Sequence, residues 1–369
     1  MPFNVTLQQG ESYYVHCELG GKFGGLTGSS INADKPIAVI GGGESGHIPY
    51  PNPDDYNYLN PHFDQFIPIE LLGTEYITVP FRSRLRGDTF KIVATEDNTT
   101  FTINSGAPIT FSQSGDFYET ILETASDIRS DKPIVVAQFA NSAEYDFFDN
   151  EYGDGSMVIL SPANRFVTCH NFPVGLGNRF DSSFVNVVVP DGVQRAVTLD
   201  GAVLSDTAFH PVQNAPFFYA QFILAPGMHA LETSDARGVG AIVYGFEAHD
   251  AFTFNSGFLI QKKVKLADAE KENIVNGFSI DRINPNPFGA ATLASLQSTS
   301  IQFSVPSSGH VTLKMYNLLG EEVGTLVNDV REAGKYSVHW NAQTNPSGMY
   351  FCRLTMNSMS ATKMIVLMK

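Results

Sequence analysis

The amino-acid sequence predicts an all-β protein made of tandem β-sandwich-like units. Short runs rich in Val, Ile, Phe and Tyr alternate with clusters of Gly, Asn, Asp and Pro, which is the pattern of strands joined by turns. The 28 Phe and 14 Tyr suit packed sheet layers. One segment also recurs after 97 residues, which indicates repeated structural units.

Strands are expected along the whole N-terminal region, and helical periodicity is absent from its sequence. Each candidate is a short apolar run that ends at a turn cluster. In chain order they are Ser12–Cys17, Pro36–Ile40, Tyr76–Pro80, Thr89–Ala94, Thr100–Ile103, Phe117–Leu122, Ile134–Phe139, Phe184–Val189, Ala196–Leu199, Phe217–Leu224 and Gly240–Phe246.

An internal repeat divides this region into units. The segment Ile31–Ile40 returns as Ile128–Ala137, and both contain Asp-Lys-Pro-Ile; Asp235–Tyr244 is a weaker echo. A hairpin motif, Phe90–Gly106, returns as Phe184–Gly201. We expect Asp-Lys-Pro to open a strand after each hairpin, because a proline costs least where a strand begins. The predicted units run roughly over residues 1–80, 81–180 and 181–261, with the first incomplete.

Charge is distributed unevenly along the chain. The formal net charge is −15, and residues 1–261 hold 12 Lys and Arg against 30 Asp and Glu. An acidic body of this kind repels phosphate backbones, so we expect no nucleic-acid partner. The stretch 262–277 carries four Lys and predicts a linker before a separate domain at 278–369.

A glycine-rich run matches the spacing of a nucleotide-binding motif but lacks the helix that should follow it. Gly41-Gly-Gly-Glu-Ser-Gly46 has the GxGxxG spacing and follows a predicted strand. The pattern needs a helix next, whose N–H groups hold a pyrophosphate. Three prolines within the next seven residues forbid that helix, so we expect a turn. Gly43–His47 likewise lacks the context of a serine nucleophile elbow, and we expect no catalytic residue and no cofactor.

An acidic loop at Ala143–Ser156 is the best candidate for a metal site. Calcium prefers several carboxylate oxygens around a turn, and four carboxylates of this loop are candidate ligands. It lacks the EF-hand spacing, so a calcium site and a solvated acidic loop both stay open as interpretations. The four carboxylates are Asp146, Asp149, Glu151 and Asp154.

Histidines and cysteines form no local metal motif. A weaker site would require His47 and His62 to meet Asp54 or Asp55 on the proline-rich loop. The three cysteines are too few and too far apart for a disulfide framework. We expect each to be a small buried hydrophobic residue: Cys17, Cys169 and Cys352.

The last 92 residues form a separate pattern of short strands. Asn284-Pro-Asn-Pro287 predicts a turn that opens this domain, since proline keeps the chain extended. Val311, Leu313 and Met315 alternate as one buried face, as expected for an immunoglobulin-like sandwich. The expected strands are Ser300–Val305, His310–Tyr316, Glu322–Val327, Tyr336–Asn341, Met349–Met356 and Thr362–Met368.

These motifs resemble the C-terminal sorting domain of cargo of the bacterial type IX secretion system. The resemblance implies that the translocation machinery recognises the domain and that cleavage near residues 270–285 removes it. The passenger is then left on lipopolysaccharide or released. By resemblance, the sorting signal comprises Pro285, Asn286, Pro287, Gly348, Tyr350, Lys363 and Lys369.

Export also requires a leader that crosses the inner membrane. Met1-Pro-Phe-Asn-Val lacks the basic start and apolar core of such a leader. No run of 18 apolar residues predicts a membrane-spanning helix. We therefore expect that the printed chain begins inside a longer protein, which is delivered to the outer-membrane surface or the medium.

The N-terminal region, roughly residues 5–260, resembles the domain family named for the IgG Fc-binding protein. The matching motifs are Leu26-Thr-Gly-Ser with Asp34–Val39, then Asp64–Tyr76 and Asp131–Val136. This family occurs in secreted and surface proteins, which agrees with the tail. The family is named after one member, so its name does not imply that this chain binds antibodies.

For the passenger, residues 1–261, we expect a non-catalytic binding or adhesion module rather than an enzyme. Repeated sandwiches, long aromatic loops and the lack of a catalytic motif favour this function. Two alternatives stay open. One is a secreted glycan- or protein-directed hydrolase, which needs a pocket with two carboxylates about 5–10 Å apart. The other is a structural surface-layer component.

Overall fold

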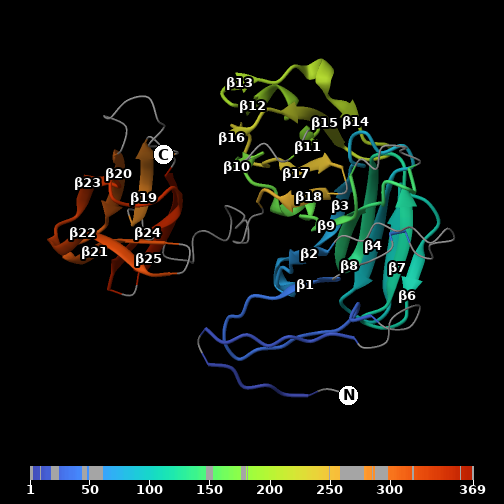
Figure 1. Cartoon of the computed structure of the whole chain (residues 1–369), viewed down its shortest axis with the longest axis horizontal. Coiled ribbons are helices and arrows are strands. Elements are labelled where there is room, and N and C mark those ends of the chain that lie inside the picture. The colour runs from blue at the N-terminus through green and yellow to red at the C-terminus, as the bar shows by residue number, and fades with distance from the viewer. Residues whose placement is uncertain are drawn as a thin grey trace. The chain divides into compact units, whose positions relative to one another are not determined.

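The computed structural model describes residues 3–8, 10–17, 25–43, 48–49, 61–146, 153–175, 180, 182–248, 250–257, 278–284, 286, 298–317, 320–357 and 359–367. These residues contain strands and short 3₁₀ helices but no α-helix, which confirms the all-β prediction. None of them forms a helix that could span a membrane. The chain divides into two compact units, residues 1–262 and 263–369, which are described separately (Figure 1).

The first sheet of the passenger unit is organised around one long strand, β8 (Ser126–Ala140). Its strand order is β6-β5-β8-β4-β7, and β3 and β9 also pair with β8. The first half of β8 pairs with β3 and β5, and the second half pairs with β4 and β9. The other bounds are Gly73–Thr78 for β3, Asp88–Ala94 for β4, Thr99–Ile103 for β5, Ile109–Phe111 for β6, Phe117–Leu122 for β7 and Ser156–Ile159 for β9.

Pro133 lies where β8 changes partners, and the prediction that Asp-Lys-Pro opens a strand is wrong here. Ser130 is the last residue of β8 paired with β5, and Ile134 is the first paired with β4. A proline has no N–H to donate to a sheet ladder. It therefore fits at the junction between two ladders, inside a strand that continues through it.

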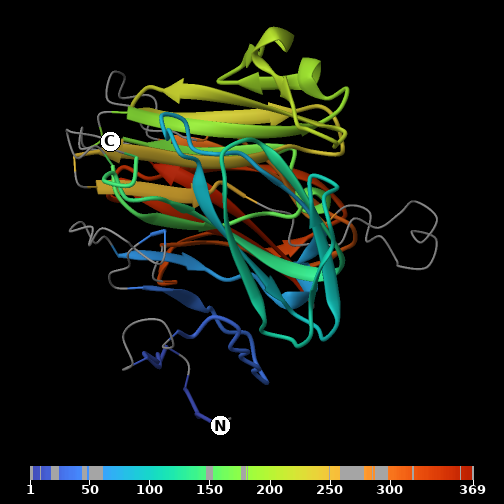
Figure 2. The ribbon, with the colours of Figure 1, turned by 90° about the vertical axis from the view of Figure 1, so that its right-hand side faces the viewer.

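The passenger unit has two further large sheets (Figure 2) besides the two-stranded ribbon of β1 (Ile40–Gly43) and β2 (His62–Gln65). One has the order β14-β15-β11-β17-β18, and the other has the order β10-β16-β12-β13. The bounds are Cys169–Val174 for β10, Ser182–Pro190 for β11, Val197–Leu199 for β12, Ala202–Val203 for β13, His210–Pro211 for β14, Phe217–Leu224 for β15, Gly227–Thr233 for β16, Gly240–Glu247 for β17 and Asp250–Asn255 for β18.

The five-stranded sheet is the middle of three layers. Strand β11 is buried along almost its whole length, because both of its faces are covered. Val185 and Val187 join a core with Leu231 of the four-stranded sheet. Phe184 instead joins Phe90 in the core of the first sheet. The structure is sandwich-like as expected, but successive units share a layer.

The hairpin between β12 and β13 has the turn that its Asp-Gly sequence favours. Asp200 and Gly201 have φ angles of 53° and 79°, and Leu199 pairs with Ala202. Positive φ at both central residues is the requirement of a two-residue type I′ turn. The Asp200 carboxylate also accepts a hydrogen bond from the N–H of Ala230 at 2.9 Å.

The N-terminal segment departs from the prediction. Ser12–Cys17 does not form a strand, and Pro36–Ile40 reaches only the first residue of β1 (Ile40–Gly43), which pairs with β2 (His62–Gln65). Ile37 is 54% exposed, whereas Ile134 at the corresponding position of the repeat is fully buried. The same motif is a buried strand only where β3 and β4 pair with it on either side, as at Ile134.

The C-terminal unit is a sandwich of a three-stranded and a four-stranded sheet, with orders β19-β20-β23 and β22-β21-β24-β25. Val311, Leu313 and Met315 are fully buried between the sheets, as predicted. Trp340 and Tyr350 pack edge to face with ring centroids 5.0 Å apart. The bounds are Ser279–Asn284 for β19, Ser298–Val305 for β20, Gly309–Tyr316 for β21, Glu322–Arg331 for β22, Gly334–Asn341 for β23, Gly348–Met356 for β24 and Met359–Leu367 for β25.

Candidate functional site

The acidic loop of the passenger unit contains a buried ion pair. Asp146 Oδ2 lies 3.5 Å from Arg84 Nη1, and the two side chains are 0% and 1% exposed. Asp146 Oδ1 accepts a hydrogen bond from the N–H of Arg86 at 3.0 Å. Burial raises the pKa of Asp146, and the Arg84 guanidinium partly opposes that rise. The expectation of a solvated loop is therefore wrong for Asp146.

The calcium site stays a prediction. Asp154 is also buried, and its Oδ1 accepts a hydrogen bond from the N–H of Gly155 at 2.7 Å. Asp149 and Glu151 lie outside the described residues. Within the described part of the chain, no three His, Cys, Asp or Glu side chains gather in a group that could hold a metal ion.

A buried segment between the first two sheets is held by side chains from both. Gln138 Nε2 and Asn186 Nδ2 donate to the carbonyl oxygen of Val79 at 2.9 and 3.0 Å. The N–H of Arg82 donates to Tyr244 Oη at 2.8 Å. Buried backbone groups outside a sheet ladder need such partners. Gln138 and Asn186 come from β8 and β11, so this polar network joins the two layers.

Asp88 is the most perturbed carboxyl group of this network. Its Oδ2 accepts hydrogen bonds from the N–H of Phe81 at 2.6 Å and from Gln138 Nε2 at 2.8 Å. Its Oδ1 is buried without a partner. Burial raises the pKa of Asp88 to about 7. Arg84 thus interacts with three buried carboxyl groups, Asp88, Asp146 and Asp154.

The glycine-rich run is partly a strand and is shaped by close backbone approach. The expected turn is wrong for Gly41–Gly43, which form most of β1. A Cβ atom on Gly42 would lie 1.9 Å from the carbonyl oxygen of His62 on β2, so only glycine fits there. The rest of the motif, through Gly46 and His47, lies outside the described residues, as do Asp54 and Asp55.

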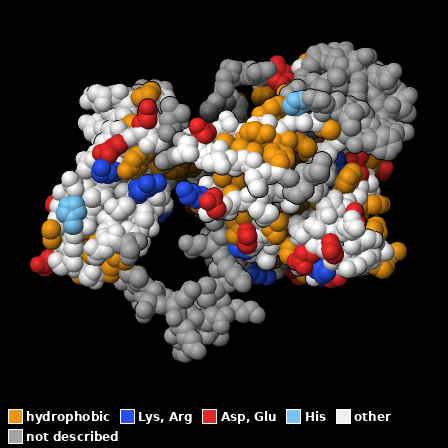
Figure 3. All heavy atoms as spheres, turned by 90° about the horizontal axis from the view of Figure 1, so that it is seen from below, with side chains coloured by type: hydrophobic (Ala, Val, Ile, Leu, Met, Phe, Trp, Pro, Cys, Tyr) orange, Lys and Arg blue, Asp and Glu red, His pale blue; other side chains and the backbone are white. Residues whose placement is uncertain are grey.

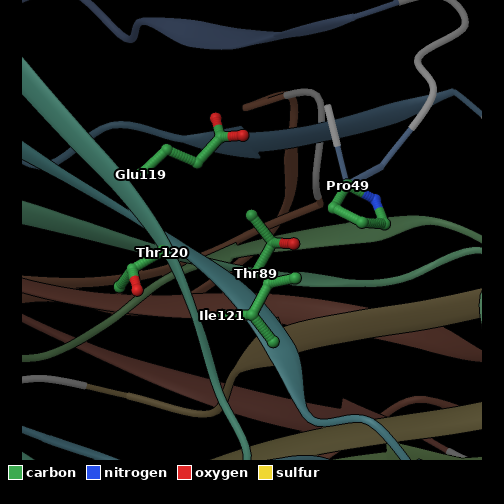
Figure 4. Close-up of a pocket in the computed structure, with 5 residues that line it drawn as sticks. All are labelled: Pro49, Thr89, Glu119, Thr120 and Ile121. Atoms are coloured by element: carbon green, nitrogen blue, oxygen red, sulfur yellow. The ribbon is translucent and has the colours of Figure 1, made fainter. Parts of the chain in front are cut away.

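A shallow pocket lies over β4 and β7 (Figure 4). Its volume is about 270 Å³, and its five lining residues include one carboxylate, Glu119. Glu119 Oε2 lies 3.2 Å from Lys91 Nζ, so its charge is already compensated. The lining residues are Pro49, Thr89, Glu119, Thr120 and Ile121.

A serine and a histidine meet inside the passenger unit. His170 Nε2 lies 2.9 Å from the carbonyl oxygen of Val239, and Nδ1 lies 2.7 Å from Ser256 Oγ. Because a carbonyl oxygen only accepts, Nε2 carries a proton, and the single proton of the Ser256 hydroxyl is shared between Nδ1 of a neutral imidazole and the carbonyl oxygen of Ala241, 3.0 Å away. Burial lowers the pKa of His170, which agrees with this state. The pair ties β10 to the chain after β18.

The cysteine prediction is confirmed at one position and wrong at two. Cys352 is buried in the C-terminal core, where burial raises the pKa of its thiol to about 12. Cys17 and Cys169 are exposed. Cys169 begins β10, whose residues alternate between exposed and buried, and it falls on the exposed face.

In the C-terminal unit, Asn286 of the predicted sorting signal binds the backbone of the last strand. Its Nδ2 donates to the carbonyl oxygen of Met364 at 3.0 Å, and its Oδ1 accepts from the N–H of Val366 at 2.9 Å. Both groups belong to β25, which pairs with β24 on its other side. The asparagine thus joins the entry of the domain to its C-terminal edge.

Lys363 makes a second link between the first and last strands of the domain. Its Nζ donates to the carbonyl oxygens of Ile280 at 3.1 Å and Asp281 at 3.0 Å. The register of β19 against β20 shifts between Ile280 and Arg282. Such a bulge leaves backbone groups without ladder partners. The lysine satisfies two of them.

The remaining sorting residues are structural or lie outside the described part. Tyr350 is 3% exposed, and its hydroxyl donates to the carbonyl oxygen of Pro346 at 2.7 Å. Gly348 begins β24. The structure therefore brings Asn286 and Lys363 to one edge and leaves Tyr350 in the core. Pro285, Pro287 and Lys369 fall outside the described residues.

Comparison with solved structures gave similarities too weak to carry an argument about fold or activity. A GH2 beta-galacturonidase from Eisenbergiella tayi bound to glycerol is 8% identical, covers 80% of this chain and 44% of its own, and has a TM-score of 0.17. The I-band fragment I67-I69 from titin is 13% identical, with coverages of 80% and 98% and a TM-score of 0.17. The chain spans less than half the length of the galacturonidase. Comparison with curated proteins found no match.

Two family models match the chain. The one described as Secretion system C-terminal sorting domain matches residues 283–368, which confirms the interpretation of the tail as a type IX sorting domain. The protein is accordingly sorted to the outer-membrane surface or the extracellular medium. The model described as IgGFc binding protein matches residues 1–245. The chain therefore belongs to the IgGFc binding protein family and ends in a secretion system C-terminal sorting domain.

Proposed function

We propose that the passenger acts as a non-catalytic binding or adhesion module on the cell surface. The outer face of the β1–β2 ribbon carries this proposal. Ile40 and Phe63 are 68% and 65% exposed, and the register places Phe63 opposite Gly42, on the same face as Ile40. Side chains diagonal to one another on a strand pair lie close enough to form one apolar patch.

Two further exposed apolar side chains come soon after β2 in the chain. Phe66 follows β2 and lies over Gly41, on the opposite face of the ribbon from Ile40, and Ile69 begins a short 3₁₀ helix; they are 37% and 52% exposed. In Figure 3, hydrophobic side chains gather on the surface of the passenger. An exposed apolar patch such as the Ile40–Phe63 pair favours a site that binds another molecule. The ligand class that suits it is a protein or glycan with an apolar face of its own.

The geometry supports a binding module over a secreted hydrolase. In the described part of the passenger, the pocket over β4 and β7 has one carboxylate among its lining residues. Glu75 and Asp127 do approach each other, but Arg129 contacts both, at 2.7 and 2.6 Å. A guanidinium between two carboxylates compensates the charge that general acid and base catalysis would use. A surface-layer role stays an alternative.

The binding proposal predicts a specific loss. The purified full chain should bind at least one ligand on an array of glycans and host proteins. The double variant Ile40→Ser/Phe63→Ser should weaken that binding by about tenfold or more, because two apolar side chains leave the interface. Val203→Ser, at a position that is 69% exposed on β13, is the matched control and should bind as wild type does. Hydrolysis of an array compound, or equal binding by all three proteins, would contradict the proposal.

We also propose that the sorted passenger stays attached to lipopolysaccharide after its tail is removed. A fusion of residues 278–369 to an exported reporter tests the sorting step, because this unit has its own core. The reporter should reach the surface of a type IX-competent host and be shed together with lipopolysaccharide. Retention in the periplasm would refute sorting, whereas surface arrival without lipopolysaccharide would refute the attachment alone.

A further inference from the structure

We propose that the free edge of β25 is a docking site for an extended strand of the type IX sorting machinery, and that Asn286 covers one end of this edge. The inference rests on the sorting function of the C-terminal domain.

The edge of β25 that faces away from β24 has backbone N–H and C=O groups available for hydrogen bonding. Met364 and Val366 direct backbone groups away from β24, since they bind Asn286. Backbone groups alternate in direction along a strand of an antiparallel pair. The N–H groups of Thr362 and Met364, and the carbonyl of Thr362, therefore also face outward. Within the described ranges, none of these three groups has a hydrogen-bond partner.

Asn286 shows how a strand would bind at this edge. Its amide contacts the carbonyl of Met364 and the N–H of Val366, which flank Ile365. One residue of a parallel neighbouring strand makes the same pair of bonds, to the residues before and after the one opposite it. The side chain thus stands in for a strand at one position and leaves the rest of the edge open.

An exposed apolar face lies beside the open edge. The register places Met364 opposite Phe351 and Val366 opposite Met349. Phe351 and Met349 are 36% and 42% exposed, whereas Tyr350 between them is buried in the core. The side chains of an added strand would lie against this face. The partner strand should therefore carry apolar side chains at alternate positions.

The chemistry of the edge selects the class of partner. A row of outward N–H and C=O groups is matched by another peptide backbone, and such edges attract strands. A glycan or a lipid headgroup has no comparable alternation of donors and acceptors. Two residues that the resemblance assigns to the sorting signal, Asn286 and Lys363, bind at or across β25. This placement favours the sorting machinery over an unrelated partner.

Proline substitutions in the full chain, expressed behind an inner-membrane export leader, test the proposal. Thr362→Pro removes one outward N–H and leaves the ladder with β24 intact, which is where a proline is tolerated in a sheet. Asn328→Pro does the same on β22, the opposite edge of the sheet, where the pairing places the N–H of Asn328 outward. Thr362→Ala removes the side chain and keeps the N–H. The readout is the ratio of surface to periplasmic protein in a type IX-competent host.

Thr362→Pro should lower this ratio by about tenfold, the value of one lost hydrogen bond at a tight interface. Thr362→Ala and Asn328→Pro should sort as wild type does. Normal sorting of Thr362→Pro, or equal losses in Thr362→Pro and Asn328→Pro, would overturn the docking site. Failure of wild type to reach the surface would instead refute the sorting function itself.

Two further measurements address a loss of stability in Thr362→Pro and a dimer of the chain. If Thr362→Pro melts well below wild type, a photo-crosslinking amino acid at position 362 replaces it, with position 328 as the control. Crosslinks to a translocon or sorting component from position 362 alone support the proposal, and their absence contradicts it. If purified wild type dimerises and Thr362→Pro is monomeric, the edge belongs to a second copy of the chain, and the proposal is wrong.

Discussion

Replacing Arg84 with methionine should destabilise the passenger unit by about 3–5 kcal/mol, the cost of leaving a buried carboxylate without its cation. Asp146 is fully buried and has Arg84 as its ion-pair partner. Arg84 also lies over the ring of Phe246, 4.2 Å from its centroid, so the guanidinium contributes packing as well as charge. The free energy of unfolding of the full chain, measured by urea titration of the passenger transition, checks this value.

Two controls separate the buried pair from a general effect of losing an arginine. Arg82 is exposed, although it lies only two residues away, and Arg82→Met should cost less than about 1 kcal/mol. Arg84→Met/Asp146→Asn should recover at least half of the loss, because asparagine is neutral and still accepts the Arg86 N–H bond. A double variant as unstable as Arg84→Met would contradict the ion-pair explanation.

The stability of the passenger unit should fall as pH rises from about 4 to 7, through the titration of Asp88. Burial raises the pKa of this carboxyl to about 7 from an unfolded value of 3.8. The folded state therefore binds the proton more tightly than the unfolded state does. The stabilisation is complete below the unfolded pKa and is lost as pH rises through the folded pKa. The shift corresponds to a change in unfolding free energy on the order of 4 kcal/mol.

Asp88→Asn isolates this contribution. Asparagine is neutral at every pH and keeps an oxygen for the N–H of Phe81. The difference in unfolding free energy between wild type and Asp88→Asn should therefore shrink or change sign between pH 4 and pH 7.5. Burial also raises the pKa values of Asp64 and Asp127, but these groups act equally in both proteins. A difference that stays constant with pH would show that Asp88 is ionised throughout.

The positions of strands that combine an alternating apolar pattern with flanking turn residues could be predicted from the sequence. Phe117–Leu122 and Phe217–Leu224 have the same bounds in the sequence and in the structure. The alternation of Val311, Leu313 and Met315 identified the buried face of β21. These features are local, since a strand needs only the alternation of its side chains and the residues that end it.

Strands with weak local patterns were missed or misplaced. β10 and β16 pair with each other and carry His170, Pro173 and His229, which interrupt an apolar pattern. Ser12–Cys17 has an apolar pattern but forms no strand. A strand is stable only with neighbours that pair with it, and a single sequence does not reveal which neighbours a segment has.

The sequence pointed to residues of the sorting signal and of the acidic loop, but it did not reveal which groups those residues contact. The resemblance of the tail pointed to Asn286 and Lys363, yet their bonds to β25 and β19 span 78 to 83 residues. The composition of the acidic loop predicts a calcium site. The sequence does not reveal that Asp146 of this loop is paired with Arg84, 62 residues away in the chain.

Local patterning of the chain determines the all-β class, most strand positions, the two-part division and the sorting tail. Only the tertiary structure decides that the five-stranded sheet is a shared middle layer, that Asp88, Asp146 and Arg84 form a buried cluster, and that Asn286 covers an edge strand. The reason is physical. Strand formation depends on alternation over a few residues, whereas burial, pKa shifts and edge pairing depend on which distant segments come into contact.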